Sequence, residues 1–225
     1  MEKFAIIVAG GTGARFGSTI PKQFVPLCKE PMLMRTIRAF HAYDPAVTII
    51  VALPTEYVTM WDDLCKAHSF TIPHTIVEGG ANRFDSVSHA LDAIHADKGL
   101  VAVHDGARPL VTRELISNGY ETALRCGTAI PTIPVTDSIR QLDRTGSHTL
   151  NRDSLAAVQT PQVFDLALLK DAYNTEFSPL FTDDASVVEY RGTQVTLYKG
   201  DVNNLKVTHP IDLKTAEWLI ESAHE

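Results

Sequence analysis

The sequence of 225 residues has few of the features that mark secreted, disulfide-stabilised or membrane-spanning proteins. Its only cysteines are Cys28, Cys65 and Cys126, which are far apart and show neither paired metal-ligand spacing nor a disulfide framework. No apolar run approaches the roughly 20 residues that span a bilayer, and the N-terminus lacks a signal-peptide pattern. We therefore expect a cytoplasmic protein with reduced thiols that crosses no membrane.

Basic residues are also scarce. The 20 lysines and arginines are outnumbered by 27 acidic residues, which gives a formal net charge of −7. This balance argues against a nucleic-acid-binding protein, which would be expected to carry a basic face. An anionic ligand would need cations concentrated locally, so the position of each arginine and lysine is informative. The remaining composition, 44% hydrophobic and 21% charged, is that of an ordinary globular domain with one continuous core.

Strand-like and helix-like segments alternate along the first 135 residues. The expected strands are residues 4–8, 47–53, 72–77, 100–103 and 129–135, and the expected helices are residues 32–43, 56–69, 83–96 and 113–126. This alternation predicts an α/β fold with a doubly wound, mostly parallel sheet of the Rossmann-like type. Ligands bind outside the carboxyl ends of the strands in such sheets. The polar clusters at residues 10–17, 79–86 and 104–109 each follow a strand, so they should gather along one edge.

The pattern changes at about residues 135–152, where strand, turn and strand follow one another. Asp143-Arg144-Thr145-Gly146 supplies the turn of a β-hairpin inserted into the α/β pattern. The hairpin is either an ordinary surface feature or an arm that packs on a second subunit. We find no linker, repeat or low-complexity segment, so residues 1–225 are expected to form a single domain with this excursion.

The clearest group of candidate binding residues follows the first strand. Residues 10–17 are rich in glycine, which lets the backbone approach a ligand closely, and successive N–H groups in such a loop form a concave anion site. Arg15 adds a rigid donor fork and Lys22 a compact ammonium group. Together they indicate a phosphate-binding loop with two cations.

Two common phosphate motifs do not fit this loop. The dinucleotide fingerprint needs a third glycine where Phe16 stands, and an acidic residue where the second strand ends at Leu53-Pro54. The P-loop pattern needs Gly-Lys-Ser or Gly-Lys-Thr, which does not occur near these glycines. A nicotinamide-dependent dehydrogenase is therefore disfavoured, and the presence of both Arg15 and Lys22 disfavours a non-catalytic nucleotide sensor.

Two strings of this loop resemble the sugar-phosphate nucleotidyltransferases, and among them the cytidylyltransferases: Ala9-Gly10-Gly11-Thr12-Gly13-Ala14-Arg15-Phe16 and Ile20-Pro21-Lys22-Gln23-Phe24. Further strings follow in the order of that family: Gly79-Gly80-Ala81-Asn82-Arg83-Phe84-Asp85-Ser86-Val87, His104-Asp105-Gly106-Ala107-Arg108-Pro109, Asn151-Arg152-Asp153, Gln159-Thr160-Pro161-Gln162-Val163-Phe164, Thr182-Asp183-Asp184-Ala185-Ser186 and Asn203-Asn204-Leu205-Lys206-Val207-Thr208. The branch includes the 2-C-methyl-D-erythritol 4-phosphate cytidylyltransferases of the non-mevalonate isoprenoid pathway, which the strings favour. The ribitol 5-phosphate cytidylyltransferases are the alternative.

The resemblance implies roles for individual residues. Those expected to act in catalysis are Arg15, Lys22 and Lys206. Those expected to bind the nucleotide are Ala9, Gly10, Gly11, Thr12, Gly13, Gly80, Ala81, Arg83, Ser86 and Gly106. Those expected to bind the acceptor are Arg108, Ser138, Arg152, Thr160 and Thr182. Asp105 is expected to hold Mg²⁺, a hard cation that prefers oxygen ligands, and His104 is assigned to structure.

The resemblance also implies partners. The substrates would be CTP and a polyol phosphate, and the transfer would release pyrophosphate. The protein would be a homodimer with exchanged arms, in which Arg152 reaches the acceptor bound to the neighbouring subunit. Thr182–Ser186 has a second interpretation as a helix start with capping potential.

Overall fold

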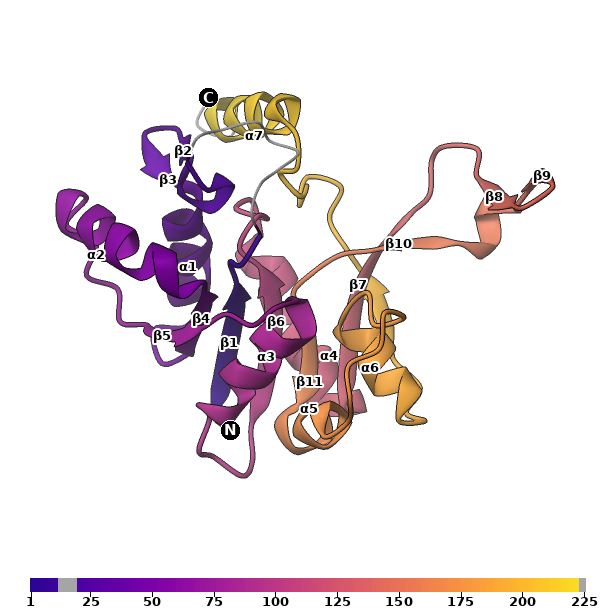
Figure 1. The fold of residues 1–225 in the computed structure, drawn as a ribbon, viewed down its shortest axis with the longest axis horizontal. Coiled ribbons are helices and arrows are strands. Elements are labelled where there is room, and N and C mark those ends of the chain that lie inside the picture. Colours follow the sequence, from indigo (N-terminus) through magenta and orange to yellow (C-terminus); the bar gives the residue numbers. More distant parts are fainter. Residues whose placement is uncertain (12–19, 223–225) are drawn as a thin grey trace.

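The computed structural model describes residues 1–11 and 20–222. In this part of the chain, eight strands form one sheet in the order β10-β7-β11-β6-β1-β4-β5, with β12 beside β7 (Figure 1). The strands are β1 (Lys3–Val8), β4 (Thr48–Leu53), β5 (Thr75–Glu78), β6 (Leu100–Asp105), β7 (Thr128–Pro134), β10 (Ala156–Val158), β11 (Gln162–Asp165) and β12 (Leu197–Lys199). The pairs among β5, β4, β1 and β6 are parallel, and β11 runs antiparallel to both β6 and β7. The expected mostly parallel sheet is therefore confirmed.

Helices cover both faces of the sheet. They are α1 (Met32–Tyr43), α2 (Val58–Ala67), α3 (Arg83–Asp92), α4 (Arg113–Cys126), α5 (Leu166–Tyr173), α6 (Asp184–Tyr190) and α7 (Pro210–Ser222). Alternate residues of β1 point to opposite faces: Ile7 packs in a core with residues of α1, α2 and α4, and Ile6 packs in a second core with residues of α3, α5 and α6. Burial of the strands on both faces explains their continuous apolar runs.

The expected elements are present, most of them within one or two residues of the predicted limits, and α1 and α4 match the predicted ranges. The third strand begins at Thr75 rather than at residue 72, because Pro73 has no N–H to donate to a neighbouring strand. The helix expected to reach residue 96 ends at Asp92. The backbone carbonyls of Ile94 and Ala96, which follow the helix, accept hydrogen bonds from Lys170 Nζ of α5. These two carbonyls therefore have a partner outside a helix, and the Ile94 side chain stays buried.

The expected hairpin is present and projects away from the sheet (Figure 1). Its strands, β8 (Arg140–Asp143) and β9 (Gly146–Thr149), form a separate two-stranded sheet, and all of their residues are exposed. The Asp143 carboxylate accepts hydrogen bonds from the backbone and side chain of Thr145, which closes the turn. We call residues 135–152 the arm.

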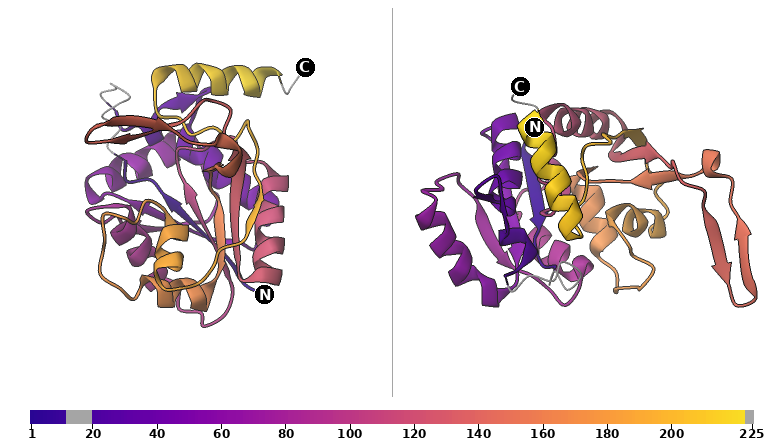
Figure 2. Two further views of the ribbon diagram at one scale, coloured as in Figure 1. Left: turned by 90° about the vertical axis from the view of Figure 1, so that its right-hand side faces the viewer. Right: turned by 90° about the horizontal axis from the view of Figure 1, so that it is seen from above.

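A third, smaller core lies beyond the carboxyl end of β1, where α7 crosses the top of the molecule (Figures 1 and 2). It joins the short strands β2 (Pro26–Leu27) and β3 (Glu30–Pro31) to the loop before α7, with Leu27, Val207 and Ala216 buried together. The single turns η1 (Lys22–Phe24), η2 (Thr55–Tyr57) and η3 (Arg152–Ser154) complete the described elements. Across residues 1–11 and 20–222, no helix is long and apolar enough to cross a membrane.

Candidate active site

Two adjoining cavities lie at the carboxyl ends of β1 and β6. The first, here called the nucleotide cavity, has a volume of about 280 Å³ and is lined by Val8, Gly10, Gly11, Lys22, Gly80, Ala81, Asn82, Arg83, Ser86, Asp105, Ala107 and Lys206. The second, here called the acceptor cavity, also measures about 280 Å³ and is lined by Arg83, Asp105, Arg108, Val158, Gln159, Thr160, Gln162, Thr182, Asp183 and Lys206. The described parts of the three predicted clusters therefore meet at one edge of the sheet. Arg83, Asp105 and Lys206 line both cavities and form what we call the shared wall.

The loop before α3 closes one side of the nucleotide cavity. Asn82 caps α3 by accepting a hydrogen bond from Asp85 N. The Ser86 hydroxyl donates to Asn82 O at 2.8 Å and accepts from Gly80 N at 3.0 Å. Since a hydroxyl has one hydrogen and two lone pairs, Ser86 keeps one lone pair for a ligand. Gly80 was expected to bind the nucleotide, and its N–H is already used inside the loop.

Gly80 is required at its position for steric reasons. A Cβ atom there would lie 2.2 Å from Asp85 Cβ and 2.9 Å from the Asp85 backbone carbon. The loop therefore passes directly over the start of α3, and only glycine permits this approach.

Asp105 is the centre of a group of cations. Its carboxylate lies 2.8 Å from Lys206 Nζ, 3.5 Å from Arg108 Nε and 3.6 Å from Arg83 Nε. Burial alone would raise the pKa of Asp105, but the charges of Arg83 and Lys206 outweigh it and hold the pKa well below its usual range. Asp105 is therefore ionised at neutral pH.

Arg83 is held from behind by α6. Its Nη1 and Nη2 donate to the two carboxylate oxygens of Asp184 at 2.8 and 2.7 Å, and Tyr173 Oη donates to the same carboxylate. Burial lowers the pKa of Arg83, but Asp184 and Asp105 more than reverse this effect and raise it above its ordinary value. Arg83, which was expected to bind the nucleotide, lines both cavities, while its fork is committed to Asp184.

The two lysines come from distant segments and meet in the nucleotide cavity. Lys22 Nζ donates to Val207 O at 3.1 Å, which ties η1 to the segment that carries Lys206. Gly10 and Gly11 lie beside them on the cavity wall. Thr12, Gly13 and Arg15, expected in the same loop, lie outside the described residues.

The remaining predicted residues divide between the cavities and the arm. Arg108, Thr160 and Thr182, which were expected to bind the acceptor, line one cavity together, here the acceptor cavity. Ser138 and Arg152 are exposed residues on the arm and are not among the lining residues of either cavity. Arg152 Nη1 donates to Thr136 O at 2.6 Å within the arm.

Two further predicted residues lie just behind the nucleotide cavity. Ala9 and Gly106 follow β1 and β6, and Gly106 N donates to Val8 O at 2.9 Å. A Cβ atom at Gly106 would lie 3.2 Å from Val8 O and 3.4 Å from Ala9 Cβ. These residues therefore bring the ends of the two central strands together beneath the cavity.

The donor set suits a cation that arrives with a triphosphate. Asp105 is the only carboxylate among the described lining residues of the nucleotide cavity, and residues 1–11 and 20–222 contain no group of three or more potential metal-ligating side chains. Mg²⁺ is usually held by one or two carboxylates together with substrate phosphates. Asp105 would therefore be the residue of this cavity that holds Mg²⁺.

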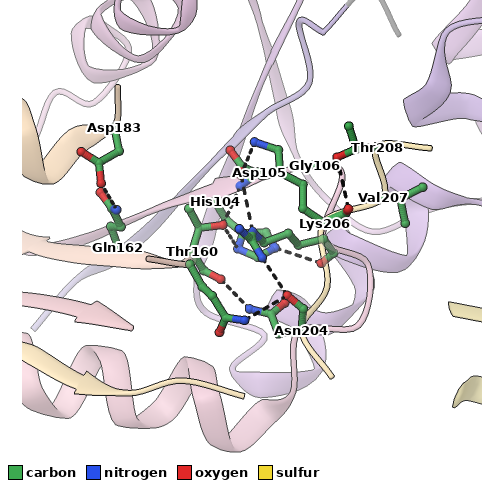
Figure 3. A network of polar contacts seen from close by, with 12 residues as sticks. His104, Asp105, Gly106, Thr160, Gln162, Asp183, Asn204, Lys206, Val207 and Thr208 are labelled. Atoms are coloured by element: carbon green, nitrogen blue, oxygen red, sulfur yellow. Dashed lines mark hydrogen bonds and ion pairs between the residues drawn. The ribbon is translucent and has the colours of Figure 1, made fainter. Parts of the chain in front are cut away.

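Sequence reasoning missed several buried polar residues that support the site. Asn204 Nδ2 donates to Thr160 O (Figure 3). Gln159 Nε2 donates to Asp201 O. The backbone oxygen of Asn204 accepts from Arg108 Nη1 at 2.7 Å. Both Gln159 and Asn204 stood in strings that resembled the family, and no periodic pattern distinguished them from surface residues.

Thr182–Ser186 behaves as the alternative interpretation predicted. Asp183 and Ser186 form a reciprocal capping box at the start of α6, and Asp183 also accepts from Gln162 Nε2. Asp184, which the sequence did not single out, is the partner of Arg83. The helix start thus has both a structural and a site-supporting role.

The doubly wound sheet, Gly10 and Gly11 after its first strand, the two converging lysines and the carboxylate at its carboxyl edge fit the sugar-phosphate nucleotidyltransferase class that the sequence resembles. Residues 4–222 match the 2-C-methyl-D-erythritol 4-phosphate cytidylyltransferase family, and the chain belongs to this family.

Relatives and solved structures agree with this assignment. The chain is 49% identical over 220 residues to 2-C-methyl-D-erythritol 4-phosphate cytidylyltransferase of Phocaeicola vulgatus, covering 98% of this chain and 100% of that protein. It is 47% identical, with the same coverage, to the protein of that name from Bacteroides fragilis. Among solved structures, the enzyme of that name from Thermus thermophilus superposes with a TM-score of 0.79 at 32% identity, covering 98% of this chain and 100% of that one.

Proposed function

We propose that the protein transfers CMP from CTP to 2-C-methyl-D-erythritol 4-phosphate and releases pyrophosphate, a step in the synthesis of isoprenoid precursors. The observation that carries the proposal is the shared wall, since Arg83, Asp105 and Lys206 line two adjoining cavities. A nucleotide in one cavity and a polyol phosphate in the other would meet at these three side chains.

The chemistry requires positioning more than proton transfer. A phosphate oxygen of the acceptor attacks the α-phosphorus of CTP, a new P–O bond forms, and the bond to the β-phosphate oxygen breaks as pyrophosphate leaves. The acceptor phosphate is already an anion at neutral pH, so no general base is required. The enzyme must hold two polyanions together and stabilise charge on the α-phosphoryl oxygens.

The two lysines supply this stabilisation in the described part of the site. Lys22 and Lys206 both line the nucleotide cavity, and we assign to them the oxygens of the α-phosphate, with Arg15 as a third cation. Asp105 would hold Mg²⁺, which when bound neutralises phosphate charge. Gly10, Gly11 and the 80–86 loop enclose the nucleotide from the other side.

The acceptor site is proposed to be completed by a second subunit. Arg108, Thr160 and Thr182 come from the chain that holds the nucleotide. Ser138 and Arg152 would come from the partner's arm in a homodimer, because the arm projects from its own sheet (Figure 2). We further propose that residues 1–225 form one domain of a cytoplasmic enzyme.

Pyrophosphate release measures this function directly. The purified protein would be incubated with Mg²⁺, one of the four nucleoside triphosphates and either 2-C-methyl-D-erythritol 4-phosphate or ribitol 5-phosphate. We expect the highest kcat/KM with CTP and the methylerythritol phosphate. A higher kcat/KM with ribitol 5-phosphate would assign the other acceptor, and no release with any pair would overturn the proposal.

A further inference from the structure

His104 is a fully buried histidine of β6, directly before the carboxylate of the shared wall. Its ring packs against Phe40, with ring centroids 5.3 Å apart. Both ring nitrogens have a partner: Nδ1 lies 3.0 Å from Thr160 Oγ1, and Nε2 lies 3.1 Å from the backbone oxygen of Arg108. The ring therefore connects the end of β6 to the acceptor cavity and to the turn after β6 (Figure 3).

The hydrogen bonds of this ring have only one possible direction. The Arg108 carbonyl can only accept, so His104 Nε2 carries the hydrogen, and Nδ1 of the neutral ring must accept from the Thr160 hydroxyl. The same hydroxyl oxygen accepts from Asp105 N at 3.0 Å. Both ends of the chain are backbone groups whose roles are fixed, so its direction cannot be reversed.

We propose that His104 is a positioning residue for the transfer reaction, which orients the Thr160 hydroxyl and fixes the Arg108 turn beside Asp105. The inference rests on the proposed function, because it assumes that Asp105, Arg108 and Thr160 face the substrates. It also limits what Thr160 can recognise. Its hydrogen points to His104 and one lone pair meets Asp105 N, so it can only accept a hydrogen bond from a hydroxyl group of the acceptor polyol.

The tautomer of His104 tests the hydrogen-bond chain without any substrate. Nitrogen-15 NMR of histidine-labelled protein at pH 7 distinguishes a protonated from an unprotonated ring nitrogen, and loss of one signal set in His104→Phe assigns the residue among the nine histidines. We expect a neutral ring with hydrogen on Nε2. Thr160→Val should shift the Nδ1 signal by removing its donor while Nε2 stays protonated. Hydrogen on Nδ1 would overturn the proposal.

Steady-state kinetics test the positioning role. His104→Phe retains a ring to pack on Phe40 but lacks both hydrogen bonds, and we expect kcat/KM to fall about 10- to 100-fold, as is usual when a supporting partner of a site residue is removed. The Asn side chain of His104→Asn can still accept a hydrogen bond from Thr160. Its KM for the polyol phosphate should therefore lie between that of His104→Phe and that of the unmodified protein.

Tyr120→Phe is the matched control. It removes another buried hydrogen bond, from Tyr120 Oη to Phe4 O at 2.8 Å, near the opposite end of β1, and should leave kcat/KM unchanged at a temperature where both variants are folded. Wild-type kcat/KM in folded His104→Phe would overturn the positioning role. If the unmodified protein does not transfer CMP, that result counts against the proposed function alone. The tautomer measured by NMR would still test the direction of the hydrogen bonds that His104 makes.

Discussion

Removing one partner of the ion pair between Arg83 and Asp184 should destabilise the protein far more than removing one partner of an exposed pair. Asp184 is fully buried and accepts two hydrogen bonds from the Arg83 fork. In Asp184→Asn the amide offers only one oxygen, and its NH₂ group faces an N–H of Arg83, so a partly buried guanidinium loses its nearer counter-charge and keeps only Asp105. Breaking a buried pair in this way costs about 3 to 5 kcal/mol, a large part of the ~5–15 kcal/mol that stabilises a typical domain.

Asp171→Asn supplies a matched control. Asp171 pairs with Arg191 at 3.5 Å, and the two side chains are 68% and 39% exposed. An exposed pair of this kind contributes at most about 1 kcal/mol. Both variants replace an aspartate that faces an arginine, so the difference between them compares a buried, hydrogen-bonded carboxylate with an exposed one.

Urea-induced unfolding at pH 7 measures both variants. We expect the free energy of unfolding to fall at least about 2 kcal/mol further in Asp184→Asn than in Asp171→Asn, from the two ranges above. Equal losses would show that solvent or local rearrangement compensates Arg83, and would refute the reasoning. The KM for CTP should also rise in Asp184→Asn, because Arg83 Nε lies 3.6 Å from Asp105.

Three further predictions concern loop geometry, subunit exchange and pH. Gly80→Ala should raise the KM for CTP in the pyrophosphate assay, because its Cβ would lie 2.2 Å from Asp85 Cβ; an unchanged KM would contradict this. Lys22→Ala should lower kcat by about 10²–10³. If arms are exchanged, mixed dimers of one Lys22→Ala chain and one Arg152→Ala chain should regain activity, because one of their two sites has both Lys22 and Arg152. No gain of activity on mixing the two variants would argue against exchange. Burial lowers the pKa of His104 from 6.5 to about 4. Between these two pH values the unfolded chain binds more protons at this residue than the folded protein does. The free energy of unfolding should therefore fall as the pH falls, by up to ~3 kcal/mol. This loss should be absent from His104→Phe in urea titrations compared at pH 7 and pH 4.5.

The sequence predicted the architecture where periodicity and burial agree. The apolar runs of β1 and β6 are continuous because both strands are covered on both faces, and α1 and α4 show apolar residues at helical spacing. The edge of the sheet could be located for the same reason, since parallel strands carry their following loops to one side. Strand and helix ends were less predictable, because Pro73 and Lys170 act through backbone hydrogen bonds that periodicity does not record.

Partners of site residues were harder to predict than the site residues themselves. Arg83 and Asp105 stand next to glycines and strand ends, which are local signals. Asp184 and Asn204 act from 101 and 96 residues away from Arg83 and Arg108, respectively. Such pairings depend on the path of the folded chain, so an interpretation of local patterns finds one member and misses the other.

The charge of the site follows from these distant pairings. A protein with a formal net charge of −7 must still attract two polyanions, and it does so by burying acids behind its cations. Asp184 takes up the Arg83 fork, and Asp105 lies within 4 Å of Arg83, Arg108 and Lys206. Asp183 lines the acceptor cavity and Lys22 lines the nucleotide cavity, so these four cations face three carboxylates, which leaves one positive charge. The buried acids also fix the cations in place before a substrate arrives, so little reorganisation is needed when phosphate oxygens replace the Asp105 contact of Lys206. The acidic surface and the cationic site are therefore compatible, because the field near the cavities is set by the nearest side chains and distant exposed charges are screened within about 8 to 10 Å.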